Sequence, residues 1–122
     1  MNKTTFQGKT NRGRLHLDSI GSAISGAQDA QYRMILNATL GGSPSFTDIS
    51  TNQSIAAFDV AGTTVTGGIE WRRGPSVGNF QLNEDVSTLE MRLNPGETLT
   101  FSGFSFANAV APNLSVSWRE EL

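Results

Sequence analysis

Three segments near the C-terminus alternate apolar and polar residues with a period of two. Their apolar members are Leu89, Met91 and Leu93, then Leu99 and Phe101, then Leu114, Val116 and Trp118. This period is typical of a strand with one buried and one solvated face. Asn94-Pro95-Gly96 separates the first two segments. Pro suits the second position of a type II turn and Gly the third, so the pattern predicts three strands, two of them joined by a tight turn.

Earlier segments show the same alternation over shorter lengths. Gln31 to Leu40 is the clearest, with Tyr32 and Met34 on its apolar face, and Leu15 and Leu17 predict a first strand over residues 14–18. Further brief strands are expected at residues 46–49, 54–60, 62–66, 69–71 and 77–82, with a break at Arg72-Arg73-Gly74-Pro75. Ser19 to Ala30 is rich in Gly, Ser and Ala, which favours a loop over a poor helix.

These segments predict about eight short strands with Gly and Pro between them and no helix. Such a pattern indicates an all-β fold, a single β-sandwich of which a jelly roll is the leading version. Residues 14–122 are expected to form this domain, and residues 1–13 an extended N-terminal arm.

The expected arm carries basic residues and one large apolar residue before the first acid of the chain. They are Lys3, Phe6, Lys9 and Arg12, with Arg14 directly after the arm. Two interpretations remain open. The segment is a frayed terminus, or it orders on a neighbouring subunit with Phe6 as its anchor and the bases on acidic groups.

Three phenylalanines near Gly103 also leave two interpretations open. Phe101 continues the inward face of its strand, whereas Phe104 and Phe106 share the opposite parity. A straight strand would place the latter two rings on the outer face, where a subunit contact would cover them. A change of sheet at Gly103 would return them to the core.

The composition narrows the classes of partner and site. With 122 residues, 16% of them charged, and a net charge of −2, the chain suits one domain without overall attraction to nucleic acid or anionic membrane. It has no Cys, so disulfides and thiolate metal sites are excluded. No apolar run approaches the roughly 20 residues that span a bilayer, and no secretion signal is evident. Synthesis in a host cytoplasm is therefore expected.

The titratable residues offer little catalytic chemistry. His16 is the only histidine and is expected on the polar face of its strand. No Gly-x-Ser-x-Gly sequence positions a nucleophile. The acid pairs Glu84-Asp85 and Glu120-Glu121 are adjacent in sequence, whereas a glycosidase needs two carboxylates facing each other across a cleft. We expect no enzyme, no cofactor and no metal site, and favour solvated acids over a calcium site at residues 83–85.

Trp71 with Arg72 and Arg73 is the one aromatic and basic combination that suggests a base-stacking site. Solvated arginines at a strand end are the favoured interpretation, because the domain beyond the arm is net acidic. Nucleic-acid binding is not expected.

Two stretches prompt a comparison with a known class of proteins. One runs from Phe46-Thr47-Asp48-Ile49 through residues 58–68, and the other includes Leu93-Asn94-Pro95-Gly96-Glu97-Thr98-Leu99-Thr100 and residues 115–120. In style and order they resemble small β-rich structural proteins of tailed bacteriophages. The resemblance spans residues 46–122 and implies a virion role, such as capsid decoration, tail or fibre, without catalytic residues.

The expected function is that of a non-catalytic capsid decoration (cement) protein on the virion surface. It would be a homo-oligomer, a trimer, that bridges subunits of the major capsid protein, with Lys3, Phe6, Lys9, Arg12 and Arg14 making the contact. The alternative is a carbohydrate- or receptor-binding module of a tail or fibre, with Trp71 as its aromatic platform. Neither assignment requires a membrane.

Overall fold

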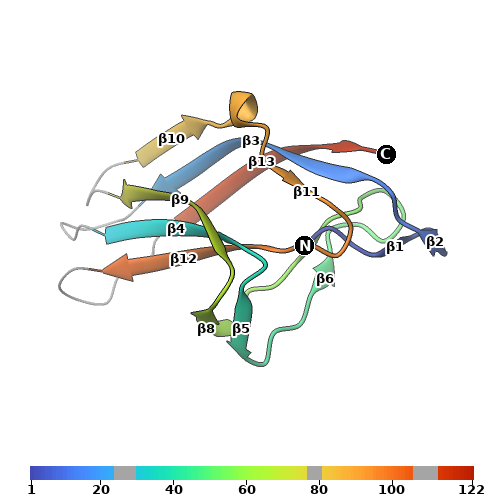
Figure 1. The fold of residues 1–122 in the computed structure, drawn as a ribbon, viewed down its shortest axis with the longest axis horizontal. Coiled ribbons are helices and arrows are strands. Elements are labelled where there is room, and N and C mark those ends of the chain that lie inside the picture. Colours follow the sequence, from blue (N-terminus) through green and yellow to red (C-terminus); the bar gives the residue numbers. More distant parts are fainter. Residues whose placement is uncertain (24–29, 77–80, 106–112) are drawn as a thin grey trace.

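The computed structural model covers residues 1–122 and describes all of them except 24–29, 77–80 and 106–112. Over the described ranges the chain is all-β, with one 3-10 helix and no α-helix (Figure 1). The strands are β1 (Thr5–Phe6), β2 (Lys9–Thr10), β3 (Arg14–Ala23), β4 (Ala30–Leu36), β5 (Thr39–Gly42), β6 (Thr47–Asp48), β7 (Ala57–Phe58), β8 (Gly62–Thr66), β9 (Ile69–Ser76), β10 (Gln81–Asp85), β11 (Arg92–Leu93), β12 (Leu99–Ser105) and β13 (Asn113–Glu121), with the helix η1 (Ser87–Leu89) between β10 and β11. The all-β prediction is confirmed, and the strands outnumber the eight expected. No helix in the described ranges is long and apolar enough to cross a membrane.

Two larger antiparallel sheets organise the molecule. In the first, β10 and β11 pair one after the other with one edge of β3, and β13 pairs with the opposite edge. In the second, β4 lies between β12 and β9. In the first sheet, β3 pairs with β13, the last strand of the chain. In the second sheet, β4 pairs with β12, the strand before β13 (Figure 1).

A bent hairpin extends the second sheet. The pairing of Leu36 with Ile69 at the end of β4 and β9 continues in register to that of Thr39 with Thr66 in β5 and β8. The register shifts by one residue between Met34 and Ile35 and again between Leu40 and Gly42. The bend lies where Asn37 has φ 55° and Gly67 and Gly68 have φ 65° and 79°. A Cβ on Gly68 would lie 2.6 Å from the carbonyl oxygen of Leu36, so this close approach requires glycine. The strand predicted for residues 31–40 is thus divided at Asn37.

The buried core of the described residues consists of two clusters. One buried cluster joins Leu17 and Ile20 of β3 to Tyr32 and Met34 of β4, with Val86 beside them. A second buried cluster consists of Leu15, Ile55, Ala56 and Leu93. The predicted inward positions at residues 15, 17, 32 and 34 are confirmed.

Three local predictions were wrong, the first two because strand pairing overrode local propensity. Ser19 to Ala23 was expected in a loop, but it belongs to β3, where Gly21 pairs with Asn83 on one side and Ser115 on the other. The expected break at residues 72–75 lies inside β9. The strand expected around residues 89–91 is replaced by η1 and by Glu90, which has φ 54°.

The structure confirms the predicted turn at residues 94–97 and the alternation along β13. Glu97 donates its backbone N–H to the carbonyl of Asn94 at 3.0 Å, and Gly96 has φ 87°, so the tight turn is confirmed. Exposed and half-buried residues alternate along the whole of β13. The register of β12 with β4 is unshifted through Gly103 to Ser105, so no change of sheet occurs there. Phe106 and the side chain of Phe104 lie outside the described residues.

Residues 1–13 do not form an extended arm. The hairpin of β1 and β2 folds back on the domain, and Asn2 forms a β-bridge with Ala56. The backbone N–H of Lys3 also donates to the carbonyl of Ile55 at 2.8 Å. The segment folds back because its polar groups find buried partners, which the spacing of charges and apolar residues did not reveal.

Candidate functional site

An apolar groove of about 550 Å³ runs between β12 and β13 and continues beneath the segment that carries β6 and β7. Of the 20 lining residues in the described part of the chain, only Asp59, Gly62 and Thr100 are not apolar. Asp59 is the single charged side chain among them. The groove is therefore a hydrophobic surface without catalytic groups, and we refer to it below as the apolar groove.

The groove is open because the inward faces of two edge strands lack a cover. In the described part of the chain, β12 pairs with β4 alone and β13 with β3 alone. Leu114, Val116 and Trp118 of β13 point toward the core but remain half-buried, as does Phe101 of β12. Leu17 of β3 is buried and forms part of the floor.

Four exposed apolar side chains form the rim at one end of the groove. Phe46 is 38% exposed, Ile49 47%, Phe58 46% and Val60 89%. The rim residues were predicted to lie on short strands, but Phe46 and Ile49 lie just outside β6, and Val60 lies outside β7, in the loop that follows it. No local pattern in the sequence signalled this surface.

Asp59 holds the rim loop in place. Its carboxylate accepts hydrogen bonds from the backbone N–H groups of Ser45 at 2.8 Å, Ala61 at 3.1 Å and Gly62 at 3.0 Å. These bonds, that of Ser45 first, lower the pKa of Asp59 below its ordinary value. Asp59 is thus a structural residue that fixes the loop presenting Phe58 and Val60.

The strand edges beside the groove carry little of the protection that edge strands usually have. Monomeric proteins protect such edges with charged residues, proline or bulges. The residues of β12, 99–105, contain no charge and no proline, and neither do residues 113–117 of β13, whereas the register of β13 shifts between Ser117 and Trp118 and charged residues follow from Arg119. Both edges are therefore suited to pairing with another strand.

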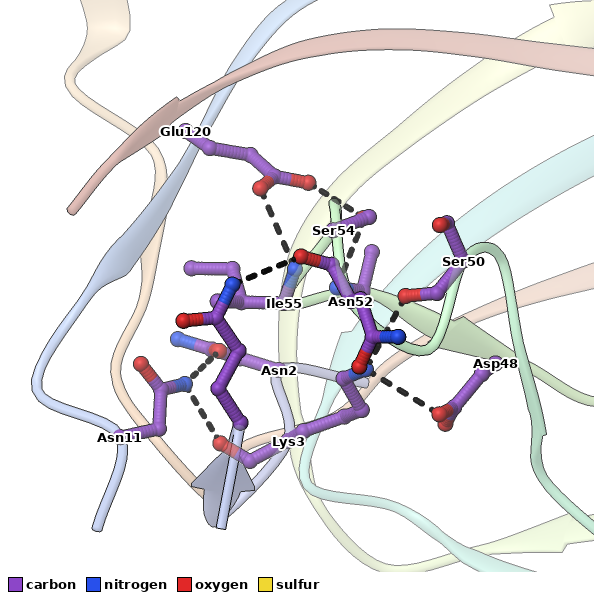
Figure 2. Close-up of polar contacts among 11 residues, drawn as sticks. Asn2, Lys3, Asn11, Asp48, Ser50, Asn52, Ser54, Ile55 and Glu120 are labelled. Carbon is purple, nitrogen blue, oxygen red and sulfur yellow. Dashed lines mark hydrogen bonds and ion pairs between the residues drawn. The ribbon is translucent and has the colours of Figure 1, made fainter. Parts of the chain in front are cut away.

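A buried polar network joins the N-terminal residues to the domain (Figure 2). Asn2 is fully buried, and its Nδ2 donates to the carbonyls of Gly13 and Leu93, each at 2.9 Å. Its Oδ1 accepts a hydrogen bond of 2.8 Å from Nδ2 of Asn11. The Nδ2 of Asn11 also donates to the carbonyl of Lys3 at 2.6 Å. Every polar atom of the Asn2 side chain is thus used inside the domain.

Lys3, predicted as a partner-binding residue, is itself part of this network. Its side chain is 10% exposed, and its Nζ lies 3.2 Å from Oδ2 of Asp48 and 3.3 Å from the carbonyl of Ser50 (Figure 2). The same ammonium group lies 5.5 Å from the centre of the Phe6 ring. Two of the three N–H donors of the Lys3 ammonium are therefore bound within the chain, and the side chain is largely buried.

The other four predicted partner-binding residues lie nearer the surface. Phe6 is half-buried and packs against the cluster around Ile55. Lys9, Arg12 and Arg14 are exposed, and Arg14 pairs with Glu121 in the register of β3 and β13. The structure thus keeps three basic side chains available for a partner at this end of the molecule.

Glu120 connects β13 to the same end. Its Oε1 accepts from the hydroxyl of Ser54 at 2.5 Å and from the indole Nε1 of Trp118 at 3.3 Å, and its Oε2 accepts from the backbone of Ile55 at 3.1 Å. Glu120 is therefore a structural anchor for the wall of the groove, a role that the sequence did not indicate.

His16 lies on the face of β3 opposite to Leu15 and Leu17, as predicted, but it is 9% exposed rather than solvated. Its Nε2 donates to Oε2 of Glu121 at 2.7 Å. This bond, with weaker contributions from Arg14 and Arg92, lowers the pKa of Glu121. His16 and Glu121 thus form a hydrogen-bonded contact between β3 and β13.

The remaining acidic and arginine candidates are engaged in pairs. Glu84 accepts from Nε of Arg72 at 2.6 Å, and Glu70 accepts from Nε of Arg73 at 2.9 Å. Asp85 accepts from the hydroxyl of Ser87 at 2.6 Å. Among the described residues, no group of three or more His, Cys, Asp or Glu side chains is placed to hold a metal ion.

Comparisons with models of known protein families, with curated proteins and with solved structures found no match.

Proposed function

We propose that this protein is a non-catalytic structural component of a virion that decorates and stabilises a capsid shell. The observation that carries the proposal is the apolar groove, whose lining contains one charged side chain in 20 residues. Large exposed apolar surfaces are typical of contacts with other macromolecules. The single charged group, Asp59, is occupied by three backbone N–H groups, so it has no free role in catalysis.

In this proposal the two larger sheets constitute an open, jelly-roll-like β-sandwich. The nested pairing of β3 with β13 and of β4 with β12 supports it, since a rolled-up hairpin pairs its strands in this order. The shared cluster of β3 and β4 side chains supports two facing sheets. A compact domain with its terminus fixed to the core is suited to presenting rigid surfaces on a shell.

The shell contact is assigned to the exposed basic end of the molecule. Lys9, Arg12 and Arg14 are exposed and would face acidic groups of a major capsid protein, with Phe6 beside them. Lys3 supports this end from within, through Asp48. Repetition of such a contact over a shell converts modest single affinities into strong avidity, which is how a decoration protein opposes disassembly.

Mass spectrometry of purified virions, with copy number per particle, tests the proposed location. A protein that repeats over the whole shell is expected at roughly hundreds of copies per particle, and such a number would support decoration. A dozen or fewer copies indicate a tail component, and complete absence rejects the virion assignment.

A binding assay with empty shells tests the proposed contact. The variant Lys9→Ser/Arg12→Ser/Arg14→Ser is expected to lose shell binding while remaining folded. The matched control is Arg73→Ser/Arg92→Ser/Arg119→Ser, which removes the same charge from exposed arginines that make surface pairs. Equal binding by the two variants would remove the basic end from the mechanism.

No observation favours the carbohydrate-binding alternative. Trp71, its expected platform, packs against both buried clusters. Tyr32 is 3% exposed, and Trp118 forms part of the groove wall. A glycan array remains the direct test of that alternative, with Trp71→Ala as the comparison.

A further inference from the structure

The apolar groove, its rim and its two unpaired strand edges form one continuous surface on the described part of the chain. We propose that a second copy of this chain covers this surface, so that the protein self-associates through the rim residues and the edges of β12 and β13. The inference deepens the proposed function by naming the occupant of the groove, and it rests on that proposal for the view that the groove takes a protein.

The exposed rim supplies part of the area that self-association needs. Taking about 200 Å² for a fully exposed Phe and about 110 Å² for Ile or Val, the four rim side chains expose roughly 300 Å² of apolar surface. A stable interface buries about 800 Å² on each partner. The half-buried walls of the groove and the backbone of the two strand edges can supply the rest.

The composition of the surface favours a like subunit over an unlike partner. Interfaces between identical subunits are more apolar than transient contacts, and charged residues are depleted at their centres. With 17 apolar residues among the 20 that line it, the groove belongs to the first kind. Because the surface carries almost no charge, two copies meet without the repulsion that a charged self-contact would bring.

A small apolar ligand fits the surface less well. The volume of about 550 Å³ lies in the range of ligand pockets, but such pockets place a few free polar groups to orient the ligand. Here the carboxylate of Asp59 is engaged by Ser45, Ala61 and Gly62. The hydroxyl of Thr100 is the other polar side chain in the lining.

Native mass spectrometry and light scattering of the purified chain test the inference. The wild type is expected at a multiple of its 13.1 kDa monomer mass. Val60→Asp and Phe58→Asp each introduce a charge on the rim and should raise the dissociation constant by roughly 100-fold. The matched controls are Ile69→Asp and Leu89→Asp, which alter apolar residues that are 63% and 50% exposed and do not line the groove.

Hydrogen exchange provides a second measurement that does not depend on a variant. Amides of residues 99–103 and 113–118 should become more protected as the protein concentration rises, whereas those of β9, which contributes no residue to the groove lining, should not change. A wild type that stays monomeric at about 100 μM overturns the inference, as does equal association of rim and control variants. A monomer carrying a bound small molecule also overturns it. In each of these cases the copy number on virions still decides the proposed function separately.

Discussion

Asn2→Ala removes a side chain whose three hydrogen bonds are all inside the domain. The carbonyls of Gly13 and Leu93 each lose their donor, and Nδ2 of Asn11 loses the acceptor that Asn2 provides. Asn2 is fully buried, so water cannot replace these partners without opening the structure. The substitution therefore isolates the cost of leaving buried polar groups unpaired.

The size of the effect follows from these groups. Each buried carbonyl without a partner costs about 1–3 kcal/mol, and Asn11 retains its second bond, to Lys3, so its share is smaller. The expected loss is about 3–5 kcal/mol of the free energy of unfolding, out of the 5–15 kcal/mol typical of such domains. With an m-value of about 1.5 kcal/mol/M, the urea midpoint should fall by about 2–3 M.

Urea denaturation followed by fluorescence and by circular dichroism measures this loss. Asn52→Ala is the matched control, because Asn52 is exposed and accepts from Gln7 through its backbone carbonyl. The control should change the free energy of unfolding by less than about 0.5 kcal/mol. An Asn2→Ala protein with the midpoint of the wild type would refute the view that residues 1–13 are fixed to the domain by this network.

Two further predictions concern the bend of the hairpin and the contact between β3 and β13. Gly68→Ala should destabilise the domain by more than Gly67→Ala. Both residues have positive φ, which costs alanine about 1–2 kcal/mol. Only at position 68 would the added Cβ also meet backbone atoms, at 2.6 Å and 2.9 Å. Thermal denaturation of the two variants provides the comparison, and equal losses would contradict it. Glu121→Gln should lower stability above pH 4.5, the ordinary pKa of the group, because the bond from His16 lowers the pKa of Glu121 in the folded state. That stability is lost as the pH falls through the lowered pKa, so denaturation curves of variant and wild type should converge in acid; a difference that grows below pH 4.5 would show the assignment to be wrong.

The fate of the N-terminal segment shows why the candidate site was harder to predict than the fold. The five predicted partner-binding residues were chosen for charge and for one aromatic ring, and these are properties of a residue alone. Lys3 proved to be buried because Asp48 and Ser50 lie beside it, 45 and 47 positions further along the chain. No local pattern reports such a distant partner.

The rim of the groove posed the same difficulty. Phe58 and Val60 share a parity with Ala56, so the alternation predicted one strand with a buried face. Ala56 is 5% exposed, but Phe58 and Val60 are 46% and 89% exposed. The strand ends at Phe58, and Asp59 then holds the chain in a loop through bonds to Ser45 and Gly62.

The sequence by itself determined the all-β class, the turn at residues 94–97 and the inward faces of β3 and β4, because a period of two and a Pro-Gly pair act over neighbouring residues. Tertiary structure decided which strands pair, since β3 joins β13 across about a hundred residues, and it made a strand of the glycine-containing segment 19–23 by placing neighbours on both sides. Only the tertiary structure showed that residues 1–13 fold back on the domain and that no described strand covers the inward faces of β12 and β13. Pairing and burial depend on groups brought together from distant parts of the chain, and a local pattern carries no record of them.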